Sequence, residues 1–438
     1  MGRSQILAIA LCIAMQGGAQ EVREWSLTDC IQHALAHNLN IKQQQDNVQQ
    51  QQLQLSTSKN SRLPDLNGSV SENFSFGRAL TSNNTYMNRN TQNTGLSLGT
   101  SVPVFTAGRI PADIKMRRLN LQAALQDYEY ARENVMLGVT TSYLEAVYQK
   151  DMVAVAERQV DLSREQVRRM ELLYQNDKAS EADLSQIRST LANDELSLTQ
   201  QRNSYMLALL ELSQLLELET PDGFDVARPI VDSVGAADLP SPDLVYGEAL
   251  GIKPQIQAEQ IRLQSAEKSV LIAKSALYPS LYFNAGLGSS YYKTSGFETT
   301  AFGRQLRDNF NQYFGATLSV PIFNRFATRN NVRSARLQVH AQQIKLEQTK
   351  KSLYKEIQQA YYNAVAASRQ CESSDAAFSS ACVAFELMQR KYENGKATLA
   401  DYQDAKTKYM RAESQQIQSR YTYLFRRKIL DFYRGNEL

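Results

Sequence analysis

Two halves of this sequence match each other in order and at an almost constant spacing, and this repeat limits the possible folds more than any other feature. Ser-Val-Pro-Val-Phe at 101–105 returns as Ser-Val-Pro-Ile-Phe at 319–323, a displacement of 218 residues. Leu-Pro-Asp-Leu at 63–66 returns as Tyr-Pro-Ser-Leu at 278–281, a displacement of 215 residues. Each half is therefore expected to fold into the same series of helices and strands.

The ends of the repeats follow from composition. Residues 20–220 form repeat 1 and residues 243–438 form repeat 2, while the proline-rich stretch 221–242 between them is predicted to be a linker in an equatorial region. Residues 1–19 combine Arg3, a short apolar run and small residues, which is typical of a signal peptide for export. Lipidation of Cys12 is disfavoured, because the preceding Leu11 is large and the apolar run is short.

Each repeat is predicted to open with a helix, at Ser26 to about Asn60 and at Pro242 to about Leu277, with Ser26 and Ser241 as N-caps. Pro64 and Pro279 then move the chain out of helical geometry. Alternating residues predict β-hairpins at about 66–104 and about 280–322. In these hairpins one face is apolar, and the other face carries small and polar residues. The expected apolar face comprises Leu66, Gly68, Val70, Phe74, Phe76, Leu96, Leu98, Val102 and Val104 in repeat 1, and Leu281, Phe283, Ala285, Leu287, Phe314, Ala316, Leu318 and Val320 in repeat 2.

A long helix is predicted after each hairpin, at about 108–174 and 325–392, with a shorter helix returning at 181–219 and 399–433. Apolar residues recur every seven positions on the long helices, which indicates coiled-coil packing. One such row is Val139, Ala146, Val153, Val160, Val167 and Tyr174, and its counterpart is Ile357, Ala364, Cys371, Phe378, Phe385 and Tyr392. Cys371 is therefore expected to be a buried small apolar residue.

Several functional classes are disfavoured. The net charge of +3 with balanced acids and bases gives no argument for nucleic acid as a partner. No nucleophile, acid–base pair or cofactor motif is present, so the chain is not expected to be an enzyme. His33 and His37 have a spacing that could hold a metal, but without a third ligand they are expected to be a surface pair. No disulfide is expected, since Cys371 and Cys382 lie about 16 Å apart along one helix.

Two hairpins supply four strands, which cannot close a barrel, and lipid does not tolerate open sheet edges. Membrane barrels start at about eight strands, so at least two chains must contribute. The predicted fold class is mainly α with a membrane β-barrel, built from two helix–β-hairpin–long-helix–helix repeats per chain. The long helices would continue the wall below the membrane, which favours conduction as the function.

The sequence resembles the outer-membrane efflux protein (TolC) family over nearly the whole chain after the signal peptide. The motifs that carry the resemblance are Trp25–Ile31 with Ala34-Leu35 and Asn38, the duplicated Ser-Val-Pro-aliphatic-Phe strand ends, and the turn with Tyr392, Gly395, Thr398 and Asp401. The resemblance implies a homotrimer with a shared 12-stranded barrel in the outer membrane, continued by a periplasmic α-helical barrel. It also implies a periplasmic adaptor (membrane fusion) protein and an inner-membrane transporter as partners, with outer-membrane lipid around the barrel. No cofactor is expected.

The resemblance also places a periplasmic gate where the coiled coils end. Asp401 and Asp404 lie three residues apart on the returning helix, match acidic constriction positions of the family, and in a trimer would form two carboxylate rings. The alternative is a solvated pair of carboxylates favoured by the helix dipole.

Tyr392 and Asp183 match the tyrosine and the aspartate of the family's closed-state lock, whereas the arginine position is Ala397. The lock is therefore expected to be weaker, or rebuilt from Lys396 or Lys178. Gly395 and, in the first copy, Asp177 are expected to take the left-handed conformation at the helix ends. The residues of the two turns are candidates for contact with the adaptor: Asn176, Asp177, Lys178 and Ser180, and Asn394, Gly395, Lys396 and Thr398.

Two rival functions stay open on the residues alone. A nonporous periplasmic coiled-coil adaptor or scaffold would show no alternation in the hairpins. A duct serving a protein-secretion transporter is not separated from one serving a small-molecule pump, because the lining of a lumen is generic.

Overall fold

The computed structural model describes residues 23–80, 84–220, 223–228 and 239–436. The predicted signal peptide, Cys12 and most of the predicted linker lie outside these residues. The chain divides into two compact units. The first comprises residues 1–45, 127–256 and 349–438, and the second comprises residues 46–126 and 257–348.

The expectation of one continuous helix at the start of each repeat was wrong, because each helix is broken after eleven residues. Repeat 1 begins with α2 (Leu27–His37) and α3 (Leu39–Asn60). Repeat 2 begins with α6 (Pro242–Ile252) and α7 (Pro254–Ser275). At the first break, Asn38 is extended, with ψ at 129°. Its side-chain oxygen accepts hydrogen bonds from the next helix, including one of 3.0 Å from the backbone N–H of Asn40. At the second break, Lys253 precedes Pro254, whose ring disfavours helical geometry in the residue before it.

The long helices agree with expectation to within two residues. α4 (Arg109–Gln175) and α9 (Ala327–Glu393) each contain 67 residues. The returning helices α5 (Glu181–Leu215) and α10 (Leu399–Tyr433) each contain 35 residues. α5 ends four residues before the predicted Glu219, because Glu217 takes a left-handed conformation with φ at 58°.

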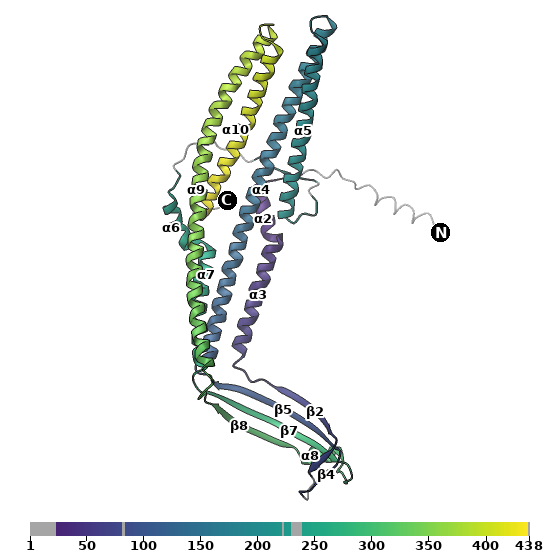
Figure 1. Cartoon of the computed structure of the whole chain (residues 1–438), viewed down its shortest axis with the longest axis vertical. Coiled ribbons are helices and arrows are strands. Elements are labelled where there is room, and N and C mark those ends of the chain that lie inside the picture. The colour runs from purple at the N-terminus through teal and green to yellow at the C-terminus, as the bar shows by residue number, and fades with distance from the viewer. Residues whose placement is uncertain (1–22, 81–83, 221–222, 229–238, 437–438) are drawn as a thin grey trace, which may run out of the picture. The chain divides into compact units, whose positions relative to one another are not determined.

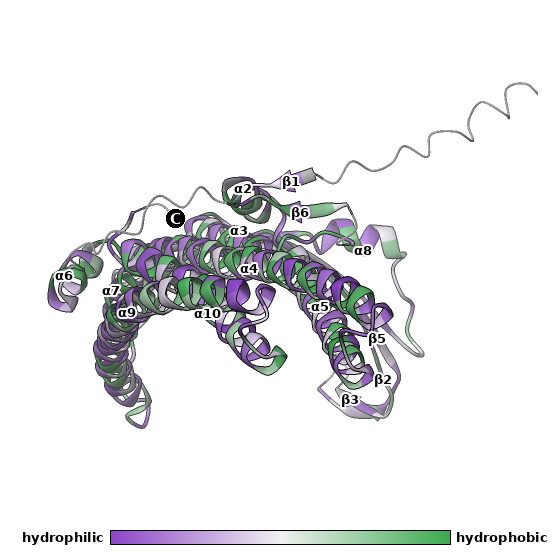
Figure 2. Ribbon diagram, turned by 90° about the horizontal axis from the view of Figure 1, so that it is seen from above, coloured by the Kyte–Doolittle hydropathy of each residue, from purple (hydrophilic) through white to green (hydrophobic). Residues whose placement is uncertain are grey.

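Small apolar residues pack along the helices of the first unit, as the seven-residue period predicts. Val139, Ala146, Ala364 and Cys371 are all buried, and hydrophobic residues recur along the long helices in Figure 2. Cys371 is 4% exposed, so the expectation of a buried small side chain is confirmed. Burial raises the pKa of its thiol, which keeps the sulfur protonated and unreactive.

The two predicted hairpins join in a single sheet in the second unit. Its strands are β2 (Asn67–Ser75), β5 (Thr91–Phe105), β7 (Ser280–Thr294) and β8 (Asn311–Ser319), in the order β2-β5-β7-β8 (Figure 1). Every neighbouring pair is antiparallel. The pairing of β5 with β7, one strand from each repeat, was not predicted. It leaves β2 and β8 as the edges of the sheet.

The return strand of the second hairpin is shorter than predicted. β5 continues through Pro103 to Phe105, whereas β8 ends at Ser319 rather than near residue 322. β5 is paired on both sides for part of its length, and a bulge between Pro103 and Phe105 accommodates the proline. β7 begins at Ser280, opposite Ser319, so the residues after Ser319 have no strand beside them.

A short helix covers part of the β7 edge. α8 (Phe302–Asp308) follows β7, and the side-chain amide of Gln305 bonds to both backbone groups of Tyr292. It accepts from the Tyr292 N–H at 3.0 Å and donates to the Tyr292 carbonyl at 3.1 Å. Gln305 thus replaces a partner strand where β7 extends beyond the end of β8.

Two further pairs of short strands were not predicted. β1 (Arg23–Trp25) pairs in parallel with β6 (Phe224–Val226), and β3 (Arg78–Leu80) pairs with β4 (Tyr86–Asn88). Tyr143 of α4, which is 1% exposed, ties the first pair to the helices. Its hydroxyl donates to the carbonyl oxygen of Ala227 at 2.5 Å and lies 3.3 Å from that of Trp25.

Candidate channel wall and gate

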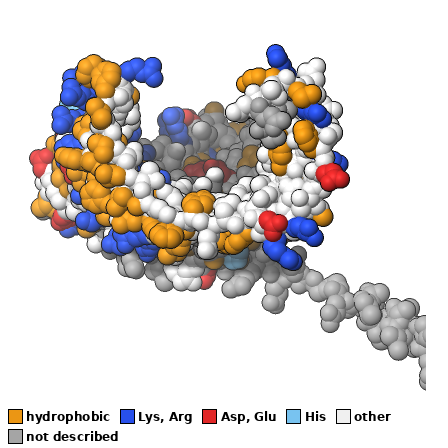
Figure 3. Space-filling model, turned by 90° about the horizontal axis from the view of Figure 1, so that it is seen from below, with side chains coloured by type: hydrophobic (Ala, Val, Ile, Leu, Met, Phe, Trp, Pro, Cys, Tyr) orange, Lys and Arg blue, Asp and Glu red, His pale blue; other side chains and the backbone are white. Residues whose placement is uncertain are grey.

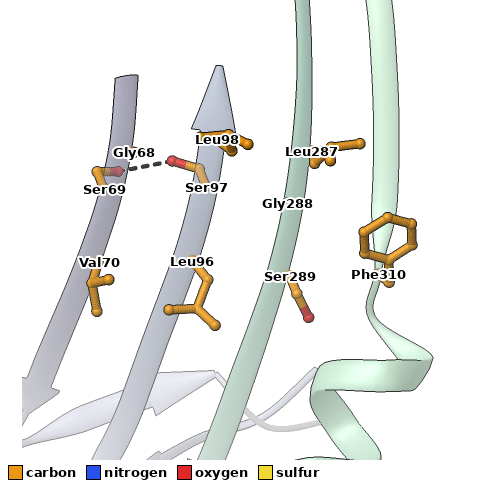
Figure 4. A pocket seen from close by; sticks show the side chains of 10 residues that line it. All are labelled: Gly68, Ser69, Val70, Leu96, Ser97, Leu98, Leu287, Gly288, Ser289 and Phe310. Carbon is orange, nitrogen blue, oxygen red and sulfur yellow. Dashed lines mark hydrogen bonds between the residues drawn. The ribbon is translucent and has the colours of Figure 1, made fainter. Parts of the chain in front are cut away.

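One face of the four-stranded sheet is apolar. The register places Val70 beside Leu96 on β5, and Leu98 beside Leu287 on β7 (Figure 4). The apolar side chains of this face are largely exposed, reaching 83% at Phe314. The register therefore confirms the predicted alternation, except at Leu66, Phe76, Val104 and Val320, which are not paired in the sheet. The apolar face contains Val70, Phe74, Leu96, Leu98, Val102, Leu281, Phe283, Ala285, Leu287, Phe314, Ala316 and Leu318.

The opposite face carries small and polar residues. Ser69 and Ser97 lie side by side there, with their hydroxyl oxygens 2.8 Å apart (Figure 4). The ring of Tyr313 lies across Gly286, where an added Cβ would come within 2.7 Å of it. Among the described residues paired in this sheet, the polar face has no Asp, Glu, Lys or Arg. The charged side chains of the paired strands, Glu72 and Lys293, belong to the apolar face, within three residues of a strand end.

Hydrophobic side chains gather in exposed patches in the view from below (Figure 3). Exposed hydrophobic surface on this scale is unusual for a protein surrounded by water and marks a contact with lipid or protein. Among the residues that the structure describes, no helix is both long and apolar enough to cross a membrane.

The turns at the far ends of the coiled coils have the same construction in both repeats. α4 ends with Asp177 at φ 55°, and α9 ends with Gly395 at φ 68°, so both left-handed positions are confirmed. The N–H of Lys178 donates to the carbonyl of Leu173, and the N–H of Lys396 donates to that of Lys391, each at 2.8 Å. These bonds close the helix ends as Schellman motifs and fix the direction of each turn.

The returning helices begin with capping boxes. Thr398 donates from its hydroxyl to Asp401 at 2.7 Å, and the N–H of Asp401 donates back to that hydroxyl at 3.2 Å. Ser180 and Asp183 form the same pair in the first turn. Hydrogen bonds from Thr398 lower the pKa of the Asp401 carboxyl, which is fully exposed and stays ionised. Within one chain, Asp401 therefore acts as a carboxylate at the start of a helix, which was the alternative to a role in the gate.

Asp404 lies one turn further along α10 and has a different partner. Its carboxylate is 2.7 Å from Lys408 Nζ, and both side chains are mostly exposed. A surface pair four residues apart on a helix contributes little stability. The two candidate gate carboxylates thus differ, because Asp401 is held by backbone and hydroxyl donors and Asp404 is paired with a cation.

Tyr392 lies in an aromatic and charged environment at the second turn. Its ring stacks on Tyr402 with centroids 4.9 Å apart, and the Arg169 guanidinium lies 5.7 Å from its centroid. Burial raises the pKa of Tyr392, the Arg169 charge lowers it, and the Asp183 carboxylate raises it. Asp183 is therefore close enough to Tyr392 to act on it electrostatically, although the hydrogen bonds assigned to Asp183 go to its own cap, Ser180.

A cation that sequence reasoning missed holds the second turn. Arg169 of α4 donates to the backbone carbonyl of Glu393 at 3.3 Å. The sequence suggested Lys396 or Lys178 in place of the arginine missing at Ala397, but both lysines are exposed in the turns. Nothing in the sequence distinguishes Arg169 from its neighbours Arg164 and Arg168, so only the docking of the two coiled coils identifies it.

The histidine pair is partly buried rather than fully on the surface. The rings of His33 and His37 stack 4.1 Å apart, and Trp25 contacts His33 edge-on, which leaves His33 half-buried. Burial, together with the neighbouring His37, lowers the pKa of His33. In the part of the chain that the structure describes, no three His, Cys, Asp or Glu side chains gather as metal ligands would.

Comparisons with known proteins agree with this geometry. The family model described as outer membrane efflux protein matches residues 30–217 and 245–436. A pyoverdine export outer membrane protein, OpmQ, of Pseudomonas putida is 25% identical over 304 residues, which cover 68% of this chain and 61% of that protein. The OpmQ of Pseudomonas aeruginosa is 24% identical over 433 residues, covering 93% of this chain and 86% of that protein. The solved CmeC outer membrane channel of Campylobacter jejuni superposes with a TM-score of 0.78 at 21% identity, covering 94% of this chain and 86% of CmeC.

Proposed function

This chain belongs to the outer membrane efflux protein family, and on that premise we propose that it is the exit duct of a tripartite efflux or secretion system. It conducts passively what an inner-membrane transporter delivers through a periplasmic adaptor. The proposed activity is conduction and requires no bond making or breaking by the chain.

The observation that carries this proposal is the two-faced sheet. Exposed apolar side chains on one face suit lipid, and an uncharged polar face of Ser, Asn, Gly and Tyr suits a water-filled passage. The rival function, a nonporous periplasmic adaptor or scaffold, predicts hairpins without alternation. The alternation in all four strands favours the duct.

The sheet also suggests how copies of the chain assemble. Its free edges, β2 and β8, are each nine residues long and run in opposite directions. β8 of one copy can therefore pair antiparallel with β2 of the next, which removes edges that lipid would not tolerate. Three copies would supply the 12 strands of the trimeric barrel that the family resemblance implies.

This closure can be tested with cysteine pairs. Ser71 and Gly315 are the middle residues of β2 and β8, and both belong to the polar face. Ser71→Cys with Gly315→Cys in one chain, in a Cys382→Ala background, should give linked dimers and trimers on oxidation. A register shifted by two residues would move the partner to Tyr313 or Thr317, so cysteines at these positions complete the set.

The matched control is Ser71→Cys with Phe314→Cys, because Phe314 points to the opposite face. Crosslinking of the control but of none of the three same-face pairs would refute this closure. The duct itself is tested in planar bilayers with protein purified from outer membranes. A detergent-resistant oligomer with measurable conductance supports it, and the absence of conductance in the wild type and in gate variants would contradict it.

A further inference from the structure

Outside the gate, a buried ionic cluster joins three helices of the first unit. Lys406 of α10 lies with Nζ 3.1 Å from Asp194 Oδ2 of α5 and 2.5 Å from Ser163 Oγ of α4. Ser163 also donates to Asp194, and Gln159 donates to the other Asp194 oxygen at 2.6 Å. These four residues, called here the Lys406 cluster, fasten the coiled coil of repeat 2 to that of repeat 1.

The cluster is deeply buried for a set of polar groups. Lys406 is 3% exposed, Ser163 2% and Asp194 8%. Separating the coils would break both Lys406 contacts at a buried site, and replacing Lys406 alone would leave the Asp194 charge without compensation. The Lys406 cluster is therefore expected to persist when exposed contacts nearby break.

The polar contacts between the cluster and the turn are single, long hydrogen bonds. Gln166 bonds to the hydroxyl of Tyr402 at 3.3 Å, and Arg169 bonds to the Glu393 carbonyl at the same distance. On the other side of the cluster, Arg158, which is mostly exposed, forms an ion pair of 2.6 Å with the half-buried Glu413. Leu399 also packs against the apolar cluster of Met170, Leu184 and Ile187, and Tyr402 is fully buried. Among the described residues, the Lys406 cluster holds the last buried ion pair between α10 and repeat 1 before the turn.

The internal repeat shows that this attachment exists on one side only. At the displacement of 218 residues between the repeats, the positions equivalent to Gln159, Ser163 and Asp194 are Ala377, Ala381 and Ala412. Lys406 corresponds to Arg188, which is exposed and pairs with Glu171 on its own coil at 2.7 Å. In a closed ring, Arg188 of a neighbouring copy would face alanines, which offer no acceptor for its charge.

We propose that Lys406 is a positioning residue that sets the pivot of the gate, so that only the part of the second coil beyond it swings when the duct opens. The coil stays attached to the first coil of its own chain at this point and separates from the neighbouring copy. This inference rests on the proposed duct.

The position of the pivot fixes the length of the moving arm. Lys406 lies seven residues after the start of α10 at Leu399, or about 10 Å along the axis. Without the cluster, the arm would extend back to Glu413, about 20 Å from the start of the helix. The same tilt would then move the turn about twice as far and widen the open state.

The experiment measures open-state conductance in planar bilayers, in an Arg169→Met background, which is expected to open more often because it loses the contact with Glu393. Adding Lys406→Met should raise the conductance of each open event, by up to about twofold if it follows the arm length. The matched control is Arg188→Met, the equivalent position in repeat 1, which should leave it unchanged. A purely structural role for Lys406 would lower the amount of oligomer without changing the conductance per channel.

Rescue and folding controls complete the test. The charge exchange Lys406→Asp with Asp194→Lys should return the conductance towards the background value. If Lys406→Met fails to assemble, Ser163→Ala keeps the ion pair, loses the bridging hydroxyl and should give a smaller increase. Equal conductance in all variants, or an equal increase with Arg188→Met, would overturn the pivot. Absence of current in every variant, including the background, would instead contradict the duct.

Discussion

Replacing Arg169 with methionine should raise the open probability of the duct. Within the chain, Arg169 donates to the Glu393 carbonyl at 3.3 Å and lies 5.7 Å from the Tyr392 ring centroid. Methionine keeps the apolar stem and removes the charge and both contacts. Because both contacts join the first coil to the second turn, beyond the Lys406 cluster, their loss is expected to free the turn without moving the pivot.

The magnitude follows from the two contacts. A partly exposed hydrogen bond from a charged donor contributes about 1 kcal/mol, and a cation–π contact at an exposed site about 0.5 kcal/mol. Both distances are at the long end of their ranges, so about 1 kcal/mol per chain is a reasonable total. If three chains open together, about 3 kcal/mol shifts the closed-to-open ratio about a hundredfold. Chains that open independently would each shift about fivefold.

The assay is single-channel recording at fixed voltage, with open probability as the readout and conductance per event as the second measurement. Arg168→Met is the control, since Arg168 is the exposed neighbour of Arg169 on the same helix. An open probability unchanged by Arg169→Met would refute the assignment. A larger effect of Lys396→Met or Lys178→Met on the open probability would also refute the assignment.

Two further predictions concern charge at the gate and the strand pair at the start of the described chain. Asp401→Asn should weaken block by multivalent cations more than Asp404→Asn, because Asp404 is already paired with a lysine; equal block in the wild type and both variants would place the carboxylates outside the passage. Hydrogen bonds from its cap hold the pKa of Asp401 below its ordinary 3.8. The stabilisation by the cap is therefore present above pH 3.8 and is lost as the pH falls through the lowered pKa of the folded protein. Block of the wild type by cations should persist until the pH reaches this lowered pKa. Tyr143→Phe removes the bond to Ala227 at a buried site, costing about 1–2 kcal/mol. Amide exchange of residues 224–226 should then accelerate roughly 5- to 30-fold, whereas unchanged exchange would show that the hydroxyl does not hold the strand pair.

Periodic features were predictable from the sequence because many residues contribute to each pattern. The seven-residue rows located the long helices to within two residues, and alternation assigned most side chains of the apolar face, although Leu66, Phe76, Val104 and Val320 are not paired in the sheet. The predicted N-caps Ser26 and Ser241 are local signals that depend on a few neighbouring residues only, and both stand at the N-cap positions, although only Ser26 bonds through its side chain. Positive φ at Asp177 and Gly395 likewise follows from the chemistry of a helix end.

Features that depend on docking between distant segments were not predictable. Arg169 and Lys406 look like ordinary coiled-coil surface residues, and only the packing of the coiled coil of repeat 2 against that of repeat 1 brings them to their partners. The breaks at Asn38 and Lys253 are a different case, because Pro254 after Lys253 was a readable signal that the helical periodicity obscured. The parallel pairing of β1 with β6 involves three residues on each side, too few for a recognisable pattern.

The Gln305 side chain that occupies the edge of β7 has a consequence for newly exported chains. Before assembly, each chain exposes strand edges, and such edges can pair wrongly and lead to aggregation. α8 blocks β7 where β8 no longer covers it, so that stretch cannot recruit a foreign strand. The two remaining free edges of the sheet have equal length, and each can be satisfied along its whole length by the other edge of a second copy. α8 thus favours pairing of an unassembled chain with a second copy of itself over pairing with a foreign strand. This effect on assembly is independent of what the finished duct transports.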